Sequence, residues 1–470
     1  MRDQAIAYDS CPATVTNVTP RRMIGVMQGL EAAIHEIGRS LSAAYPPAIR
    51  HPSRTVDQRM MQMVADRPDV QAALFRFVDA TPACRTPEEL TEHLTAFLEE
   101  VDDPPAMLKA PEALGRGRVG EKFVGSVAAA GVRHLAQRFI VGESPKAASG
   151  HLQKLWRDGA GTSLDLLGEA TVTQEEADHY ASRCADAIDV LSAAVRSWPA
   201  RPVLERDFAG PIPRANVSVK ISALTPLIRP SAPELGADDA ARRLIPLLRR
   251  ARDAGAHLHI DMESVDTLET TMQLVLEMLA DPEFHDGPSA GVVMQAYLRE
   301  SPAIVDRVLT FTREHPRAVP LTIRLVKGAY WDHEVAEARQ RGWEPPVFTE
   351  KADSDRNFEA LTRKLIDARP GIRLAVASHN LRSVSHAVAY NRMTGGGDSD
   401  IEIQVLQGLG DDLKDALTAH KIRTRVYCPV GDLVMGMAYL VRRLLENTAS
   451  TSFLSAHGRG VPIEQLLAAP

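Results

Sequence analysis

Short apolar segments alternate with helical patterns after about residue 160, and this alternation limits the possible folds more than any other feature. Eight segments read as strands: 163–167, 216–221, 257–262, 291–296, 321–326, 372–377, 401–405 and 424–428. Helical periodicity fills several of the intervals: 238–252, 265–279, 301–314, 355–367 and 432–446. Strands that alternate with helices are typical of parallel βαβ units. Eight such units over roughly 300 residues predict an α/β fold, a (β/α)8 barrel of the TIM type.

A doubly wound sheet is the alternative arrangement of the same elements. That fold would place a glycine-rich phosphate turn, Gly-x-Gly-x-x-Gly, after its first strand. The sequence has no such turn there, and we therefore favour the barrel.

The first 150 residues have a different character and predict a helical region ahead of the barrel. The N-terminus contains Pro12, Pro20 and several threonines without a clear period. Helical patterns follow at 23–44, 56–65, 70–78, 87–101 and 119–139. The predicted parts are a flexible N-terminal arm, a helical region, the barrel and a C-terminal tail, at residues 1–22, 23–150, 151–455 and 456–470.

Composition excludes some classes of protein. Hydrophobic residues make up 44% of the chain and charged residues 24%, which is ordinary for a globular protein. A net charge of −7 argues against a nucleic-acid partner. The four cysteines have neither metal-ligand nor disulfide spacing. No apolar run reaches the ~18 residues of a membrane span. We expect a cytoplasmic protein that holds no metal, with any membrane contact peripheral and at the inner face.

Polar residues stand at or just after the end of every predicted strand. In chain order they are Glu169, Lys220, Asp261, Gln295, Arg324 with Lys327, His379, Gln404 and Tyr427. Each one alone could be a side chain that leaves the core for water. A complete ring of them predicts an active site, because barrel enzymes place theirs at the carboxyl ends of the strands.

A helical segment with two adjacent arginines follows the last predicted strand. Asp432 is placed to cap its N-terminus. Tyr439, Arg442, Arg443 and Glu446 share one face, since they lie three, four and seven residues apart. Paired guanidinium groups suit a carboxylate or phosphate. The alternative is a solvated helix face with an internal Arg–Glu pair.

Several ordered motifs carry a resemblance to a known family. They are Asn216-Val-Ser-Val-Lys-Ile-Ser-Ala-Leu224, Ile260-Asp-Met-Glu263, Val293-Met-Gln-Ala-Tyr297, Arg324-Leu-Val-Lys-Gly-Ala-Tyr-Trp331, Ser378-His-Asn380 and Tyr439-Leu-Val-Arg-Arg-Leu-Leu-Glu-Asn447. Over residues 110–455 the chain resembles the proline dehydrogenase family, in particular the proline dehydrogenase region of bifunctional proline utilization A proteins. The helical N-terminus resembles the region that precedes the barrel in those longer proteins.

The resemblance implies oxidation of L-proline to Δ1-pyrroline-5-carboxylate, the first step of proline catabolism, by hydride transfer to N5 of FAD. Electrons would then pass to a quinone at the membrane. The implied substrate site consists of Glu169, Lys220, Asp261, Tyr427, Tyr439, Arg442 and Arg443. Lys220, Arg442 and Arg443 would hold the substrate carboxylate, and Glu169 would pair with Arg442. No dedicated base is evident, so water would accept the amine proton.

The resemblance also implies a set of flavin contacts. They are Gln295, Arg324, Val326, Lys327, Gly328, Ala329, Trp331, Thr349, Lys351, Ala377, His379, Gln404, Arg443 and Glu446. Arg324 would lie near N5, where a cation stabilises the negative charge of the reduced ring. Gln295 and Gln404 would bond the ring edge or the ribityl chain, and Trp331 would lie by the adenine.

Two alternatives and one question of extent stay open at this point. The same flavin barrel could act on another cyclic or N-substituted amino acid, or the chain could be a catalytically silent homologue. The 470 residues have no room for the aldehyde dehydrogenase half of a bifunctional protein. We therefore expect either a monofunctional enzyme with a separate aldehyde dehydrogenase partner or a piece of a longer chain.

Overall fold

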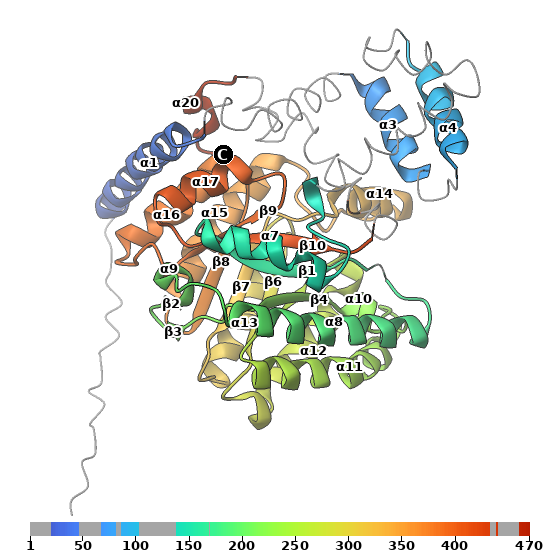
Figure 1. Cartoon of the computed structure of the whole chain (residues 1–470). Coiled ribbons are helices and arrows are strands. Elements are labelled where there is room, and N and C mark those ends of the chain that lie inside the picture. The colour runs from blue at the N-terminus through green and yellow to red at the C-terminus, as the bar shows by residue number, and fades with distance from the viewer. Residues whose placement is uncertain are drawn as a thin grey trace, which may run out of the picture.

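Eight parallel strands close into a barrel, which confirms the predicted (β/α)8 fold within the part of the chain that the structure describes (Figure 1). The structure is a computed structural model, and it describes residues 20–46, 67–80, 86–102, 138–168, 170–432, 439 and 460–470. The strands are β1 (Gly161–Leu166), β4 (Asn216–Lys220), β5 (His257–Asp261), β6 (Ser289–Gln295), β7 (Leu321–Val326), β8 (Ile372–Ala377), β9 (Glu402–Leu406) and β10 (Thr424–Val430). Their ends differ from the predicted ones by at most two residues.

The barrel closes because β1 pairs in parallel with both β10 and β4. Gly161 lies opposite Arg425, and Leu164 lies opposite Val217. Strands β1 and β5 are buried along their whole length, as expected where helices cover the outside of a parallel sheet. Since every strand runs in the same direction, all the carboxyl ends meet at one rim.

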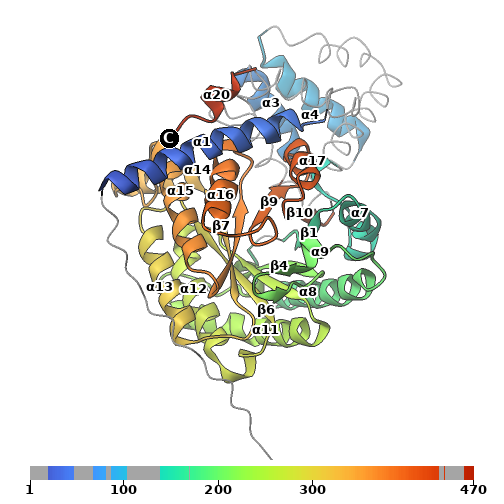
Figure 2. The same cartoon turned by 90° about the vertical axis from the view of Figure 1, so that its left-hand side faces the viewer.

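Helices connect successive strands and form the outer layer (Figure 2). They are α8 (Gln174–Val195), α10 (Ile221–Leu224), α11 (Pro233–Ala254), α12 (Val265–Ala280), α13 (Ser301–Glu314), α14 (Trp331–Arg341), α15 (Lys351–Asp367), α16 (Leu381–Met393) and α17 (Asp411–Ala419). Helix α7 (Pro145–Arg157) precedes β1. Helices α11, α12, α13 and α15 contain the predicted helical segments between strands. The helix predicted at 432–446 lies outside the described residues, apart from Asp432 and Tyr439.

Smaller elements complete the described chain. They are α9 (Pro202–Glu205), the hairpin β2 (Arg206–Asp207) and β3 (Gly210–Pro211), the 3-10 turn η3 (Pro282–Phe284), and in the terminal regions α1 (Pro20–Ala43), α3 (Pro68–Ala80), α4 (Pro87–Glu99) and α20 (Ile463–Leu466). Helices α1, α3 and α4 confirm three of the predicted N-terminal helices. Residues 20–22, which the sequence assigned to the arm, already belong to α1. A proline is tolerated in the first turn of a helix, so Pro20 starts α1 rather than preceding it.

The two terminal segments meet on helix α16 (Figures 1 and 2). The buried Arg382 of α16 donates to both carboxylate oxygens of Glu31 on α1, each at 2.8 Å, and to the carbonyl oxygen of Leu467 at 2.7 Å. Apolar contact between Leu30, Ile34 and Ala389 lies beside this cluster. Among the described helices, none is both long and apolar enough to cross a membrane.

Candidate active site

The carboxyl rim of the barrel brings Lys220, Asp261, Arg324, Gln404 and Tyr427 together, as the sequence predicts. Lys220 ends β4 directly opposite Asp261 at the end of β5. Arg324 points into the interior from β7 and contacts residues of β5 and β9. These side chains come from five different strands, and the closed barrel alone makes them neighbours.

Arg324 is the most heavily bonded side chain of this group. Its Nη1 donates to Oδ1 of Asp261 at 2.7 Å, and its Nε donates to Oε1 of Gln404 at 2.7 Å. Its Nη2 lies 3.1 Å from the hydroxyl of Ser218 and 3.3 Å from that of Ser163. The side chain is only 5% exposed. Arg324 is therefore a buried cation whose orientation is set on every side.

Asp261 is shared between a tyrosine and two cations. Its Oδ2 accepts a 2.6 Å hydrogen bond from the hydroxyl of Tyr427, and the guanidinium of Arg324 lies 5.2 Å from the centre of the tyrosine ring. The Nζ of Lys220 lies 3.7 Å from the same oxygen. Burial raises the pKa of Tyr427 well above its ordinary value, and the charges of Asp165 and Asp261 add to this. The hydroxyl of Tyr427 is thus a permanent donor near neutral pH.

Asp165 is a site residue that the sequence analysis missed. It is the second-last residue of β1, is 1% exposed, and accepts a hydrogen bond from the ammonium of Lys220. Burial alone would lower the pKa of Lys220, but Asp165 and Asp261 outweigh this effect and raise it above its ordinary value. Lys220 therefore stays a cation inside the protein. The available signal was a carboxylate between two leucines of a predicted strand, where an unpaired charge is too costly to be accidental.

Glu263 is a second missed residue, two positions after Asp261. Burial raises the pKa of its carboxyl group. Its backbone oxygen accepts a 2.8 Å hydrogen bond from the amide nitrogen of Gln295. The other end of that amide, Oε1, is buried and has no hydrogen-bond partner among the described residues. Such an atom requires an additional donor, because a buried acceptor without one is costly.

A second cationic group lies beyond the end of β7. Lys327 and Lys351 both donate to the carboxylate of Asp355 on α15. Burial lowers the pKa of Lys327, although Asp355 opposes this effect. Burial would raise the pKa of Asp355, but Lys327 and Lys351 hold it below its ordinary value. Two ammonium groups against one carboxylate leave this cluster with excess positive charge.

The backbone turn after β7 needs a glycine. Gly328 has a φ of 140°, and a Cβ at this position would lie 2.5 Å from the ring of Tyr297. Three residues later Trp331 begins α14, is 36% exposed, and donates its indole N–H to the carbonyl of Phe348 at 2.9 Å. The partly exposed indole is therefore fixed in orientation.

The remaining predicted flavin contacts surround the same rim. His379 accepts the backbone N–H of Leu406 at 2.9 Å through Nε2, so that nitrogen carries no proton. Val326 and Ala377 end β7 and β8, Ala329 follows Gly328, and Thr349 is exposed just before α15. Tyr439 is described as helical and half-buried. Outside the described residues lie Glu169, Arg442, Arg443 and Glu446.

Comparisons with known proteins agree with this arrangement. A family model described as proline dehydrogenase matches residues 148–456, which is more than half of the 470-residue chain. The chain belongs to the proline dehydrogenase family. A second model, the proline utilization A N-terminal domain, matches residues 31–139. The family predicted from the sequence motifs is thus confirmed, and so is the resemblance of the helical N-terminus.

Relatives of this family member include both long and short proteins. The bifunctional protein PutA of Salmonella typhimurium is 32% identical over 365 residues, which cover 75% of this chain and 26% of that protein. The proline dehydrogenase of Deinococcus radiodurans is 28% identical over 321 residues, 68% of this chain and 89% of that protein. The chain therefore spans about a quarter of the first relative's length and most of the second's.

A solved structure of proline utilization A from Bdellovibrio bacteriovorus, inactivated by N-propargylglycine, superposes with a TM-score of 0.85. The two chains share 31% sequence identity, and the match covers 95% of this chain and 44% of that one. The similarity therefore includes both the barrel and most of the terminal regions.

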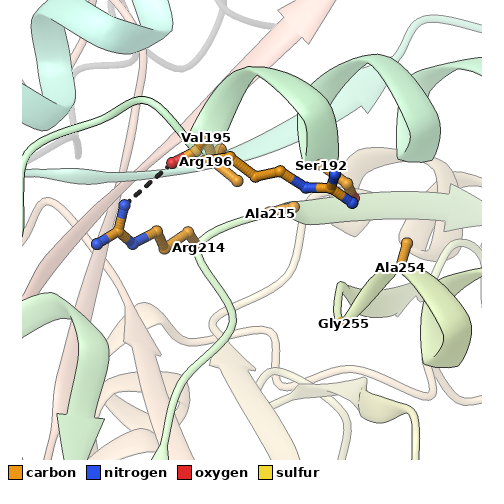
Figure 3. A pocket seen from close by; sticks show the side chains of 7 residues that line it. All are labelled: Ser192, Val195, Arg196, Arg214, Ala215, Ala254 and Gly255. Atoms are coloured by element: carbon orange, nitrogen blue, oxygen red, sulfur yellow. Dashed lines mark hydrogen bonds between the residues drawn. The ribbon is translucent and has the colours of Figure 1, made fainter.

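A cavity of about 400 Å³ lies at the opposite end of this proline dehydrogenase family barrel (Figure 3). The last residues of α8 and α11 and the start of β4 form it, with Ser192, Val195, Arg196, Arg214, Ala215, Ala254 and Gly255 as its lining. Arg214 donates to the carbonyl of Val195 at 3.0 Å and pairs with Glu205. This cavity is separate from the rim, and one of its two arginines, Arg214, is already engaged in holding the fold.

Proposed function

We propose that this chain oxidises L-proline to Δ1-pyrroline-5-carboxylate with bound FAD and that the electrons then pass to a quinone. The observation that supports this most strongly is the rim arrangement of Lys220, Asp261, Arg324 and Tyr427. It combines a buried cation for a carboxylate, a protonated phenol and a fixed guanidinium within one small site.

Lys220 binds the substrate carboxylate in this proposal. Asp165 and Asp261 keep its ammonium charged in spite of its burial, so the lysine can form a charge-assisted hydrogen bond. The family resemblance adds Arg442 and Arg443 to the same carboxylate, and Glu169 and Tyr439 around them. A carboxylate held by several cations fixes one end of the substrate, which leaves the ring only one orientation.

Tyr427 and Asp261 lie beside the substrate ring. The tyrosine hydroxyl is occupied by its 2.6 Å bond to Asp261, and in this proposal it takes the place that an additional hydroxyl on the ring would need. We therefore expect proline to be preferred over hydroxyproline. The substrate ammonium must lose a proton before the carbon–hydrogen bond breaks. Water is the proposed acceptor of this proton. Asp165 and Asp261 are the described carboxylates closest to Lys220, and both are already bound to cations.

Bound FAD supplies the hydride acceptor, and residues at the rim fit such a group. Gln295 has a buried acceptor available for a ring N–H, and the positive cluster of Lys327 and Lys351 suits an electron-rich or anionic group. Arg324 is a fixed cation of the kind that stabilises negative charge on a reduced flavin. His379, Gln404 and Trp331 would line the rest of the cofactor, together with Arg443 and Glu446 outside the described residues.

The partners of the reaction are part of the proposal. A quinone would be reached by peripheral contact with a membrane. Oxidation of the product would fall to an aldehyde dehydrogenase on a separate chain or on a part of the protein beyond this sequence. The length of the PutA relatives and of the shorter proline dehydrogenase is compatible with either arrangement.

The test is anaerobic reduction of the FAD-loaded protein by a panel of amino acids. Loss of the flavin absorbance band with L-proline, and not with trans-4-hydroxyproline at the same concentration, is the expected result. Reduction by another cyclic or N-substituted amino acid in place of proline would reassign the substrate. A protein that takes up FAD but is reduced by no amine would be the silent homologue.

A further inference from the structure

A chain of buried hydrogen bonds runs from the rim toward the amino-terminal half of the barrel. Glu402 and Gln404 are two residues apart on β9, so both side chains point to the same face of the strand. Both are buried, at 6% and 4% exposure. Gln404 accepts from Nε of Arg324 at 2.7 Å, and its own Nε2 donates to Oε1 of Glu402 at 2.7 Å. The amide thus connects Glu402, which lies below the site, to the cation within it.

Glu402 is held as a carboxylate by two arginines. Nε and Nη2 of Arg425 bond its two oxygens at 2.8 and 3.0 Å, and Nε of Arg423 lies 3.7 Å away. Burial would raise the pKa of Glu402, but Arg425 and Arg423 outweigh it and lower the pKa to about 2. At any pH where the protein works, Glu402 can therefore accept hydrogen bonds but cannot donate them.

This property decides the orientation of the amide above it. A glutamine amide has a donor end and an acceptor end, and its two orientations are nearly equal in shape. Because Glu402 only accepts, the NH2 group of Gln404 must face it. The amide oxygen then faces Arg324, which only donates. The opposite orientation would set two donors against each other at Arg324 and two acceptors against each other at Glu402.

The orientation of Arg324 depends in turn on that amide. Its Nε is fixed by Gln404, and its Nη1 is then directed at Asp261, which accepts from Tyr427 through its other oxygen. We propose that Glu402 is a positioning residue of the active site, which acts through Gln404 to set Arg324 against the flavin. This inference rests on the proposed function for its kinetic consequence, but the effect on the bound flavin does not require proline to be the substrate.

A purely structural role for Glu402 would be to neutralise Arg425 and Arg423. Such a role needs the carboxylate charge and its two hydrogen bonds with Arg425, but it needs no contact with Gln404. The substitution Glu402→Asp keeps the charge and removes the methylene that lets the carboxylate reach both Arg425 and Gln404. It therefore perturbs both roles, and the two are separated by comparing the bound flavin in this variant with that in a control that loses only ion-pair geometry.

The matched control is Glu359→Asp on α15. Glu359 is also buried and also bonds one arginine through both oxygens, Arg382 at 2.8 and 3.2 Å. Among the described residues, Glu359 forms no hydrogen bond or ion pair with Arg324, Asp261 or Gln404. Its charge acts on Lys327, and Glu359→Asp keeps that charge, so the shortening reproduces the loss of packing and of ion-pair geometry without the chain to the site.

The experiment compares the reduction potential of bound FAD in the parent and the two variants, titrated with a chemical reductant and reference dyes in the absence of proline. Glu402→Asp is expected to make the potential more negative, because a misplaced Arg324 stabilises the reduced flavin less. Its kcat with L-proline is expected to fall by about tenfold or more, with a smaller change in KM. Glu359→Asp is expected to lower the melting temperature while leaving potential and kcat at the parent values.

An unchanged potential in a folded Glu402→Asp protein, or a shift no larger than that of Glu359→Asp, would overturn the inference. If proline fails to reduce the parent flavin, the proposed function fails, and the potentials still decide the role of Glu402. If Glu402→Asp does not fold, Glu402→Gln is compared with Glu359→Gln instead. A flavin potential that shifts no more in Glu402→Gln than in Glu359→Gln would count against the proposal.

Discussion

The two ends of the barrel interior contain buried aspartate–arginine pairs with different geometry. At the amino-terminal end, Asp207 of the small hairpin uses both oxygens to accept from Arg373, at 2.8 and 3.0 Å, and also accepts from Arg423 at 3.1 Å. At the carboxyl rim, Asp261 gives one oxygen to Arg324 and the other to Tyr427, and Lys220 stays 3.7 Å away.

This difference in geometry indicates different roles: the Asp207 pair stabilises the fold, and the Asp261 pair positions side chains of the candidate site. A bidentate pair uses both carboxylate oxygens and ties together the segments that carry its partners, here the hairpin β2–β3 with β8 and the residue before β10. At the rim, Asp261 instead makes one contact with each of several donors. Those donors are positioned by Asp261 and can still form hydrogen bonds with a ligand. We therefore expect changes at Asp207 and Arg373, at the amino-terminal end (the base) of the barrel, to affect stability, and changes at the rim to affect binding and turnover.

The largest effect is expected from Arg324→Met at the rim. It removes the cation beside the flavin and leaves Oδ1 of Asp261 and Oε1 of Gln404 without the donor that Arg324 supplies, so kcat with L-proline should fall by about a hundredfold or more. FAD affinity and the flavin spectrum should change as well. The measurements are steady-state turnover and a titration of the FAD-free protein with FAD.

Arg373→Met at the base is the matched control for that change. It also removes a buried arginine from an aspartate, and it should lower the melting temperature while the folded protein keeps the parent kcat. Turnover that falls equally in both variants would remove the distinction between the two ends.

A somewhat smaller effect is expected from Lys220→Met. The loss of the ammonium weakens binding of the substrate carboxylate, so KM for proline should rise by about tenfold or more, because a charged hydrogen bond contributes about 1.5–3 kcal/mol. Bound flavin should keep its spectrum. The surface variant Lys364→Met, whose lysine pairs with Asp306 on the outer layer, should leave KM unchanged. A parent-like KM in Lys220→Met would exclude this lysine from the substrate site.

Tyr427→Phe tests the hydrogen bond between Tyr427 and Asp261, and its expected effect on KM is smaller. The hydroxyl bonded to Asp261 is removed, so we expect KM for proline to rise several-fold, on the order of one hydrogen bond, and oxidation of trans-4-hydroxyproline to become measurable. The comparison is Tyr390→Phe on α16, which removes a hydroxyl bonded to Asp367 at 2.9–3.0 Å outside the barrel. Unaltered selectivity between the two substrates in Tyr427→Phe would contradict the assigned position of the phenol.

The smallest effect is a dependence of unfolding stability on pH, and it concerns His257 at the amino-terminal end of the barrel. Burial, with the charge of Arg425, lowers the pKa of His257 from 6.5 to about 3. The unfolded chain therefore binds a proton between these pH values that the folded chain does not, and stability contributed by the neutral imidazole is lost as the pH falls from 6.5 toward 3. His257→Asn, which can still bond Ser289, should flatten the decline of urea-unfolding stability in this window. An equally steep decline would show that other groups cause it.

Much of this fold was predictable, because the periodicity of each segment agrees with the strand–helix alternation that a parallel barrel requires. The eight strands and four of the barrel helices follow from periodicity, and a parallel barrel then requires that strand-end residues such as Lys220, Asp261 and Arg324 converge. The direction of each strand end is set by topology, which is why residues far apart in sequence could be assigned to one rim.

The rest depends on partners that sequence order does not reveal. Asp165 and Glu402 lie inside strands, and a charge there has meaning only once Lys220 or Gln404 is known to lie beside it. The start of α1 was misplaced because Pro20 can begin a helix as well as interrupt one. The predicted roles of Glu169, Arg442, Arg443 and Glu446 stay predictions, since these residues lie outside the described part of the chain.

The central claim is that the rim binds proline against a flavin, and the most direct test is an anaerobic absorbance spectrum of the FAD-loaded protein before and after L-proline. We predict that the flavin band disappears on addition of proline at the same rate in the parent and in Arg373→Met, and far more slowly in Arg324→Met. A flavin band that proline leaves unchanged in the parent protein would contradict the account.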